Sequence, residues 1–149
     1  MSSNESSTTD QQPVIRCDSV FKIFGDKAKE MLAGVDCSNV DTKAFQEAGC
    51  IVGVNNASFD VARGEKLIIM GLSGSGKSTL LRCISRLTDA TAGRIFIEGQ
   101  DLLAMTNKQL IEIRREKMGM VFQSFALLPH KTVLENIAFP LQVKGVRTQ

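Results

Sequence analysis

The chain has 149 residues, of which 43% are hydrophobic and 23% charged, so it is long and apolar enough to form about one globular domain with a buried core. Its 18 Lys and Arg residues against 16 Asp and Glu residues leave a net charge of +2, without the strongly basic surface typical of nucleic-acid-binding proteins, and we expect no nucleic-acid partner. Four cysteines without a Cys-x-x-Cys pair, and a single histidine, argue against a zinc site and a disulfide framework and favour reduced, mostly buried thiols in a cytosolic protein.

Residues 1–12 are rich in Ser, Thr and Gln and contain no apolar residue after Met1. Such a segment buries too little surface to offset its ordering entropy, so we expect a disordered leader, and it lacks the basic start and apolar middle of a secretion signal. No apolar run elsewhere approaches the roughly 18–20 residues of a membrane span. We therefore expect a chain that is neither exported nor inserted in a membrane and that reaches one only through a partner.

A strand and a helical insertion are predicted after the leader. Residues 14–25 contain the β-branched and aromatic residues of a strand and end at a glycine, and Phe21 is interpreted as a core aromatic. Residues 26–53 contain two stretches rich in helix-favouring residues, 27–33 and 42–48. We interpret them as a two-helix insertion between strands.

A hairpin is predicted next. Polar and apolar residues alternate over residues 53–61, Arg63 and Gly64 turn the chain, and residues 66–70 form an apolar return strand. This return strand would lead directly into the glycine-rich stretch that follows.

The glycine-rich loop matches the phosphate-binding pattern Gly-x-x-x-x-Gly-Lys-Ser, here Gly71-Leu72-Ser73-Gly74-Ser75-Gly76-Lys77-Ser78-Thr79. Its glycines let backbone N–H groups approach phosphate oxygens, and these amides open onto a helix expected over residues 77–87, whose N-terminus favours an anion. Lys77 would bring a full charge to the β- and γ-phosphates, and Ser78 is placed to ligate Mg²⁺. A chance glycine-rich turn is the alternative, but the strand before it and the amphipathic helix after it favour the phosphate site.

Further elements are predicted downstream. Residues 94–101 are typical of a strand followed by a turn, and Thr106 with Gln109 forms a capping-box pattern for a helix that should end near Lys117. Residues 118–122 would form a second short buried strand with Gln123 at its carboxyl end. Ligands gather at that end of strands in open α/β sheets, so Gln123 is a candidate to meet a nucleotide, the alternative being a polar loop residue without a role.

An apolar loop and another helix complete the predicted elements. Residues 124–130 are mostly apolar and either form an exposed contact surface or pack inward; the residues leave both possibilities open. His130 by itself is no evidence of catalysis. Thr132 with Glu135 predicts the start of a helix, which Pro140 should kink or end.

Taken together, these residues resemble the ATP-binding subunits of ABC transporters. Residues 71–79 would be the Walker A motif and Val121-Phe122-Gln123-Ser124 the Q-loop. Within that superfamily, residues 70–79, residues 122–130 and the insertion at 26–53 resemble the glycine betaine/proline (quaternary amine) importers. The resemblance implies that residues 13–149 hold part of an ABC-type nucleotide-binding domain of the α/β P-loop NTPase fold, namely its antiparallel β subdomain and the start of its parallel core sheet.

The same resemblance implies roles for individual residues. Phe24 matches the aromatic position that stacks on adenine, which is more often tyrosine. ATP phosphates would be bound by the run Ser73, Gly74, Ser75, Gly76, Lys77, Ser78 and Thr79. Gln123 would join the Mg²⁺ and attacking-water region and, with Ser78, contribute to the metal site. Residues 124–130 would dock on a coupling helix of the membrane subunit.

The family also implies a biological setting. The protein would couple ATP binding and hydrolysis to the uptake of glycine betaine- or proline-like compatible solutes. Its partners would be transmembrane permease subunits, a second ATP-binding subunit in a homodimer and, indirectly, a periplasmic or extracellular solute-binding protein. It would be a peripheral protein at the cytoplasmic face of the cell (inner) membrane.

In that family the Leu-Ser-Gly-Gly signature, the Walker B strand, the catalytic glutamate and the switch histidine follow the Q-loop, and none of them is among the 149 residues. We therefore expect the isolated chain to bind nucleotide weakly, to hydrolyse no ATP, and to be marginally folded with an apolar sheet edge exposed. The alternative is a truncated, non-catalytic nucleotide-binding or interaction module. A kinase or GTPase is disfavoured, since no guanine-reading Asn-Lys-x-Asp segment is present.

Overall fold

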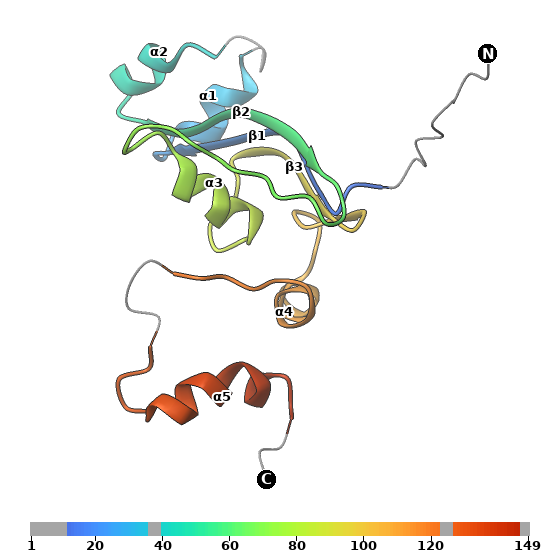
Figure 1. The fold of residues 1–149 in the computed structure, drawn as a ribbon. Helices are drawn as coiled ribbons and strands as arrows, with labels where there is room; N and C mark the ends of the chain where they lie inside the picture. Colours follow the sequence, from blue (N-terminus) through green and yellow to red (C-terminus); the bar gives the residue numbers. More distant parts are fainter. Residues whose placement is uncertain (1–11, 36–39, 123–126, 147–149) are drawn as a thin grey trace, which may run out of the picture. The chain divides into compact units, whose positions relative to one another are not determined.

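The computed structural model describes residues 12–35, 40–122 and 127–146. The chain divides into two compact units, one ending at Ala104 and the other beginning at Met105, and each is described by itself. Figure 1 shows the helices and strands along the sequence. The predicted leader falls almost wholly on residues 1–11, outside the described residues.

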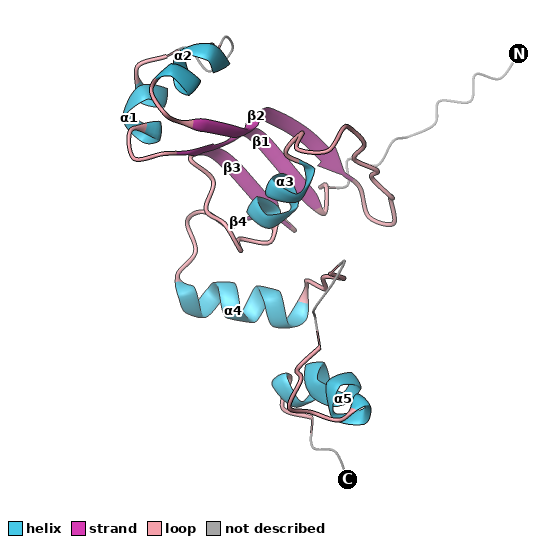
Figure 2. Cartoon of the chain, turned by 90° about the vertical axis from the view of Figure 1, so that its left-hand side faces the viewer, coloured by secondary structure: helices cyan, strands magenta, loops and turns pink. Residues whose placement is uncertain are grey.

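The first unit is built on a four-stranded antiparallel sheet with the order β2-β1-β3-β4. Its strands, magenta in Figure 2, are β1 (Ile15–Phe24), β2 (Ile51–Val61), β3 (Ala92–Ile97) and β4 (Gln100–Asp101). This confirms the predicted strands at residues 14–25, 53–61 and 94–101. The pairing of Phe24 with Ile51 places the end of β1 beside the start of β2.

The insertion between β1 and β2 contains the two predicted helices, α1 (Ala28–Ala33) and α2 (Thr42–Glu47). A hydrophobic cluster joins them to the sheet, and its buried members are Phe21, Ile23, Ala28, Leu32, Phe45 and Cys50. The Cys50 N–H donates to the Phe45 carbonyl at 2.8 Å, which ties the end of α2 to the start of β2. Phe21 is fully buried, as predicted.

Helix α3 (Lys77–Ile84) follows the glycine-rich loop and buries Leu80 and Cys83. It is shorter than the predicted helix over residues 77–87. Arg86 takes a positive φ of 56°, outside the helical region, so the chain leaves the helix before Leu87.

The predicted return strand at residues 66–70 is wrong, because this segment has no strand structure. A strand needs a neighbour that takes up its N–H and C=O groups, and among the described residues no segment pairs with it. Its apolar side chains also lack cover: Ile68 is 73% and Met70 83% exposed. Residues 66–70 do have the apolar composition of a strand, but no strand of the described sheet pairs with them.

The second unit contains α4 (Asn107–Glu116) and α5 (Val133–Val143). Both predicted capping boxes are present, at Thr106 and at Thr132. The predicted buried strand at residues 118–122 is wrong: this segment is irregular and Val121 is 99% exposed, again without a pairing strand among the described residues. Pro140 does not end α5, which continues to Val143.

The cysteines of the described residues fit the prediction of buried thiols. Cys17, Cys50 and Cys83 are free and buried, and Cys37 lies outside the described residues. Burial, as the main cause, raises the pKa of Cys17 to about 12. The Cys17 thiol is therefore a protonated core group at neutral pH.

Candidate functional site

The phosphate-binding loop enters α3 through Gly76, which takes a left-handed conformation with φ 86°. A Cβ atom at this position would lie 1.9 Å from the Gly53 carbonyl oxygen, so only glycine allows the loop to approach β2 this closely. Among the described residues, no side chain caps the helix. Its first N–H groups are therefore available to an anion.

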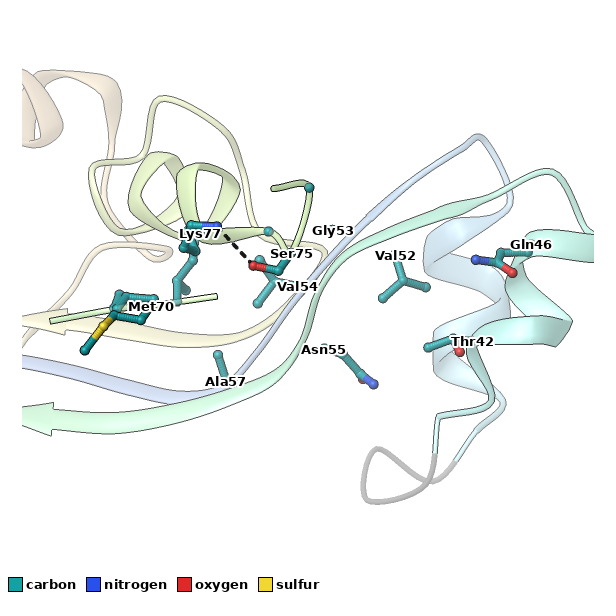
Figure 3. A pocket seen from close by; sticks show the side chains of 14 residues that line it. Thr42, Gln46, Val52, Gly53, Val54, Asn55, Ala57, Met70, Ser75 and Lys77 are labelled. Atoms are coloured by element: carbon teal, nitrogen blue, oxygen red, sulfur yellow. Dashed lines mark hydrogen bonds between the residues drawn. The ribbon is translucent and has the colours of Figure 1, made fainter. Parts of the chain in front are cut away.

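The Lys77 side chain reaches back across the loop that precedes it. Its Nζ donates to the carbonyl oxygens of Gly71 at 2.8 Å and Leu72 at 2.5 Å, and to the Ser75 hydroxyl at 3.2 Å. The contact with Ser75 is the dashed line in Figure 3. These bonds tie both ends of the loop together and keep the ammonium where a phosphate oxygen could compete for its N–H groups.

Phe24 and the loop share one pocket of about 230 Å³, although they are some fifty residues apart in sequence. It is lined by Phe24, Ile51, Val52, Gly53, Gly74, Ser75, Gly76, Lys77, Ser78 and Thr79. The Phe24 side chain is 43% exposed, which leaves ring surface open to a ligand. A planar aromatic ring beside a loop of backbone donors and hydroxyls fits a nucleotide, with the base on the ring and phosphates on the loop. Ser73 is exposed and does not line this pocket.

Gly53 is a part of this pocket that sequence reasoning missed. A Cβ atom there would lie 2.9 Å from Phe24 Cε2 and 3.2 Å from Thr79 Cγ2. Both are closer than the 3.4 Å at which ordinary contact begins. The missing side chain at residue 53 thus makes room for the ring and the loop to meet, and only the three-dimensional arrangement reveals it.

A second pocket, of about 500 Å³ and drawn in Figure 3, shares part of its lining with the first. Gly53, Ser75 and Lys77 line it, together with Thr42 and Gln46 from α2. The insertion therefore contributes polar side chains to a pocket that the phosphate-binding loop also lines. Neither side chain belongs to a motif, so the sequence carried no signal for them.

Lys22 is a further neighbour that sequence reasoning missed. Its ammonium nitrogen lies 4.9 Å from the centre of the Phe24 ring, within the range of a cation–π contact. The signal was present in the spacing, since residues two apart in a strand lie on the same face.

The predicted metal ligands are Ser78 and Gln123. Ser78 is exposed and lines the pocket, and a hydroxyl oxygen is of the ligand type that Mg²⁺ takes. Within the described ranges, no group of three or more His, Cys, Asp or Glu side chains could hold a metal by itself. Gln123 lies outside the described residues, as do 124–126 of the predicted docking loop.

Residues 127–130 of that loop precede α5, and Leu128 is hydrogen-bonded to it. The Leu128 N–H donates to Asn136 Oδ1 at 2.7 Å, and Asn136 Nδ2 donates back to the Leu128 carbonyl at 3.2 Å. Leu127 is 74% exposed and Leu128 half-buried. The loop was expected either to form an exposed contact surface or to pack inward, and the exposure of Leu127 agrees with the first of these.

Three comparisons relate the chain to known proteins. A family model described as ABC transporter matches residues 54–149. The chain is 74% identical over 137 residues to the trimethylamine N-oxide transport system ATP-binding protein TmoW of Pelagibacter ubique, covering 92% of this chain and 40% of the relative. It is 45% identical over 143 residues to the glycine betaine transport ATP-binding protein OpuAA of Bacillus subtilis, covering 95% of this chain and 34% of the relative.

Among solved structures, the chain is similar to the ATP-binding cassette MJ0796 in a dimeric post-hydrolysis state bound to ADP and Pi. The TM-score is 0.69 at 30% identity, and the match covers 91% of this chain and 50% of that one. The chain thus spans about two fifths or less of the length of these curated relatives and half of this solved cassette.

Proposed function

The chain belongs to the ABC transporter family as an ATP-binding domain of the P-loop fold, and from this we propose that it binds ATP in the pocket that Phe24 shares with the phosphate-binding loop. The observation that carries the proposal is this juxtaposition of an exposed aromatic ring with the uncapped start of α3. Adenine would stack on Phe24, and residues 73–79 would surround the phosphates.

The residues of the loop would each make a different contact with the triphosphate. Lys77 would exchange its bonds to the loop carbonyls for β- and γ-phosphate oxygens, and the first amides of α3 would donate to the phosphates. Ser78 would ligate Mg²⁺, with Gln123 as a second contact to the metal and attacking water. Mg²⁺ supplies charge neutralisation at the phosphate oxygens when it is bound.

We further propose that the whole protein is the ATP-binding subunit of an importer for small quaternary amines or amine oxides. The names of the relatives support this class: one serves trimethylamine N-oxide transport at 74% identity, another glycine betaine transport at 45%. These names favour trimethylamine N-oxide above the proline-like solutes suggested by sequence resemblance, and they do not favour a non-catalytic module.

Partners follow from the same relatives. The dimeric state of MJ0796 supports a second ATP-binding subunit, and the transport-system names support transmembrane permease subunits, with a solute-binding protein acting indirectly. In the part of the chain that the structure describes, no helix is both long and apolar enough to cross a membrane. We propose a peripheral position on the cytoplasmic face of the membrane, held by the permease.

Binding and transport can be tested with one pair of variants. Lys77→Ala should remove Mg-ATP binding measured by calorimetry, whereas Lys66→Ala, an exposed lysine outside both pockets that adjoin the loop, should not. In cells that carry the complete transport system, uptake of labelled trimethylamine N-oxide or glycine betaine should follow the same pattern. Unchanged ATP binding by Lys77→Ala would overturn the site, and uptake of neither amine would overturn the substrate class.

That the 149-residue chain hydrolyses no ATP by itself stays a prediction. Phosphate release from the isolated chain should equal that of Lys77→Ala. A steady Mg²⁺-dependent release that this variant loses would show that the chain is catalytically complete.

A further inference from the structure

We propose that Lys22 is a positioning residue for the nucleotide base: its ammonium group holds the Phe24 ring in the orientation on which adenine stacks. This inference rests on the proposed ATP site. It assigns a specific task to a lysine that belongs to no phosphate-binding motif.

Strand geometry places the two side chains together. Side chains alternate between the faces of β1, and Phe21 and Ile23 are buried in the hydrophobic cluster. Lys22 and Phe24 therefore share the opposite face of the strand. The Lys22 nitrogen lies 4.9 Å from the centre of the Phe24 ring, where the negative face of the ring attracts a cation.

Two pockets meet at Phe24 and differ in their relation to Lys22. The loop-side pocket is lined by Phe24 and the phosphate-binding residues but not by Lys22. The other pocket is lined by both Lys22 and Phe24, together with Lys29 of α1. Phe24 therefore lines both pockets, whereas Lys22 lines the one that the phosphate-binding loop does not line, and the loop-side pocket at the ring is left to the base.

Packing of the described residues covers only part of the ring. The Phe24 side chain is 43% exposed, and phenylalanine has no hydroxyl group that could anchor it by a hydrogen bond. Among the described residues Lys22 forms no ion pair, although Asp26 and Asp89 line the same pocket, and its ammonium lies over the ring. The cation therefore restricts the rotation of an otherwise loosely held aromatic ring before the base arrives, which lowers the ordering cost of binding.

The test compares two probes, Mg-ATP and inorganic tripolyphosphate, since only ATP carries a base. Lys22→Met keeps the side-chain length and removes the charge, and it should weaken ATP binding about two- to fivefold while tripolyphosphate binding stays unchanged. Lys22→Arg keeps a cation and should bind ATP normally. The matched control is Lys29→Met, which removes the same charge from the same pocket without a ring contact, and it should change neither affinity.

A double-variant cycle completes the test. In a Phe24→Leu chain, Lys22→Met should have no further effect on ATP affinity, because the ring through which Lys22 acts is gone. Equal weakening of both probes, the same loss in the Phe24→Leu chain, or unchanged ATP affinity of Lys22→Met would each refute the inference. Circular dichroism spectra matching the unmodified chain confirm that the variants fold.

Failure of the inference and failure of the proposed function give different results. If Lys77→Ala binds both probes as well as the unmodified chain, the phosphate site itself is wrong, and the inference fails with it. If Lys77→Ala loses both probes while Lys22→Met binds ATP normally, only the role of Lys22 is refuted.

Discussion

Adding a single methyl group at position 53, through Gly53→Ala, should weaken ATP binding and leave tripolyphosphate binding unchanged. The new Cβ atom would lie 2.9 Å from Phe24 Cε2, 3.2 Å from Thr79 Cγ2 and 3.4 Å from the Lys22 carbonyl oxygen. Relative to ordinary contact at 3.4 Å, the Phe24 ring must move by about 0.5 Å and the Thr79 methyl group by about 0.2 Å. The exposed ring can make this movement, and the backbone of residue 53 needs no positive φ.

The magnitude follows from the stacking energy that the displaced ring loses. Stacking of a base on an aromatic side chain contributes about 1–3 kcal/mol. A displaced but still present ring should lose part of this, about 1 kcal/mol, which corresponds to about fivefold weaker binding. Phe24→Ala, which removes the ring, sets the upper limit of the effect.

Isothermal titration calorimetry with Mg-ATP and with tripolyphosphate measures both affinities. The control is Gly119→Ala, because a Cβ atom there meets none of the described residues within 4 Å and Gly119 has no positive φ. The reasoning is refuted if Gly53→Ala binds ATP like the unmodified chain. It is equally refuted if both probes weaken together, since the disturbance would then act through the loop and Thr79.

Other parts of the chain give further predictions. Gly76→Ala, whose Cβ would lie 1.9 Å from the Gly53 oxygen, should lose more than about tenfold in affinity for both probes and lower the thermal midpoint; full affinity would contradict the close approach. Because burial raises the pKa of Cys17 to about 12, iodoacetamide at pH 8 should alkylate Cys17 only after denaturation, and peptide mass spectrometry of the native chain should show no adduct at Cys17. The Thr132 backbone N–H, and then its hydroxyl, lower the pKa of Glu135 below its usual value near 4.5, so this cap stabilises α5 above that pH and is lost as pH falls through the folded value. Carboxyl NMR titration should show this low value and a partial rise in Thr132→Ala, which keeps the backbone N–H and loses the hydroxyl, and an unchanged value would contradict the hydroxyl contact.

Local features of the fold were predictable because their causes lie within a few residues. The capping boxes at Thr106 and Thr132 depend only on a partner three positions later, and both formed as predicted. Strands need distant partners instead. Residues 66–70 and 118–122 have the apolar composition of strands, yet none of the described segments pairs with them, and the prediction failed there.

In the candidate site too, features local in sequence were predictable, and features that depend on distant residues were not. The phosphate-binding loop is contiguous, so its residue types and spacing could be interpreted from the chain alone. Gly53 and Gln46 come near the loop or Phe24 only through strand pairing and the packing of the insertion. Nothing in their immediate sequence distinguishes them from ordinary strand and helix residues.

The central claim, that Phe24 and the phosphate-binding loop form one ATP site, is tested most directly by photolabelling with 8-azido-ATP and mapping the labelled peptide by mass spectrometry. The account predicts a label in the peptides around Phe24 or Ile51–Gly53, the base end of the pocket, that excess ATP and Lys77→Ala both abolish. A label confined to other peptides, or one that persists in Lys77→Ala, would contradict the claim.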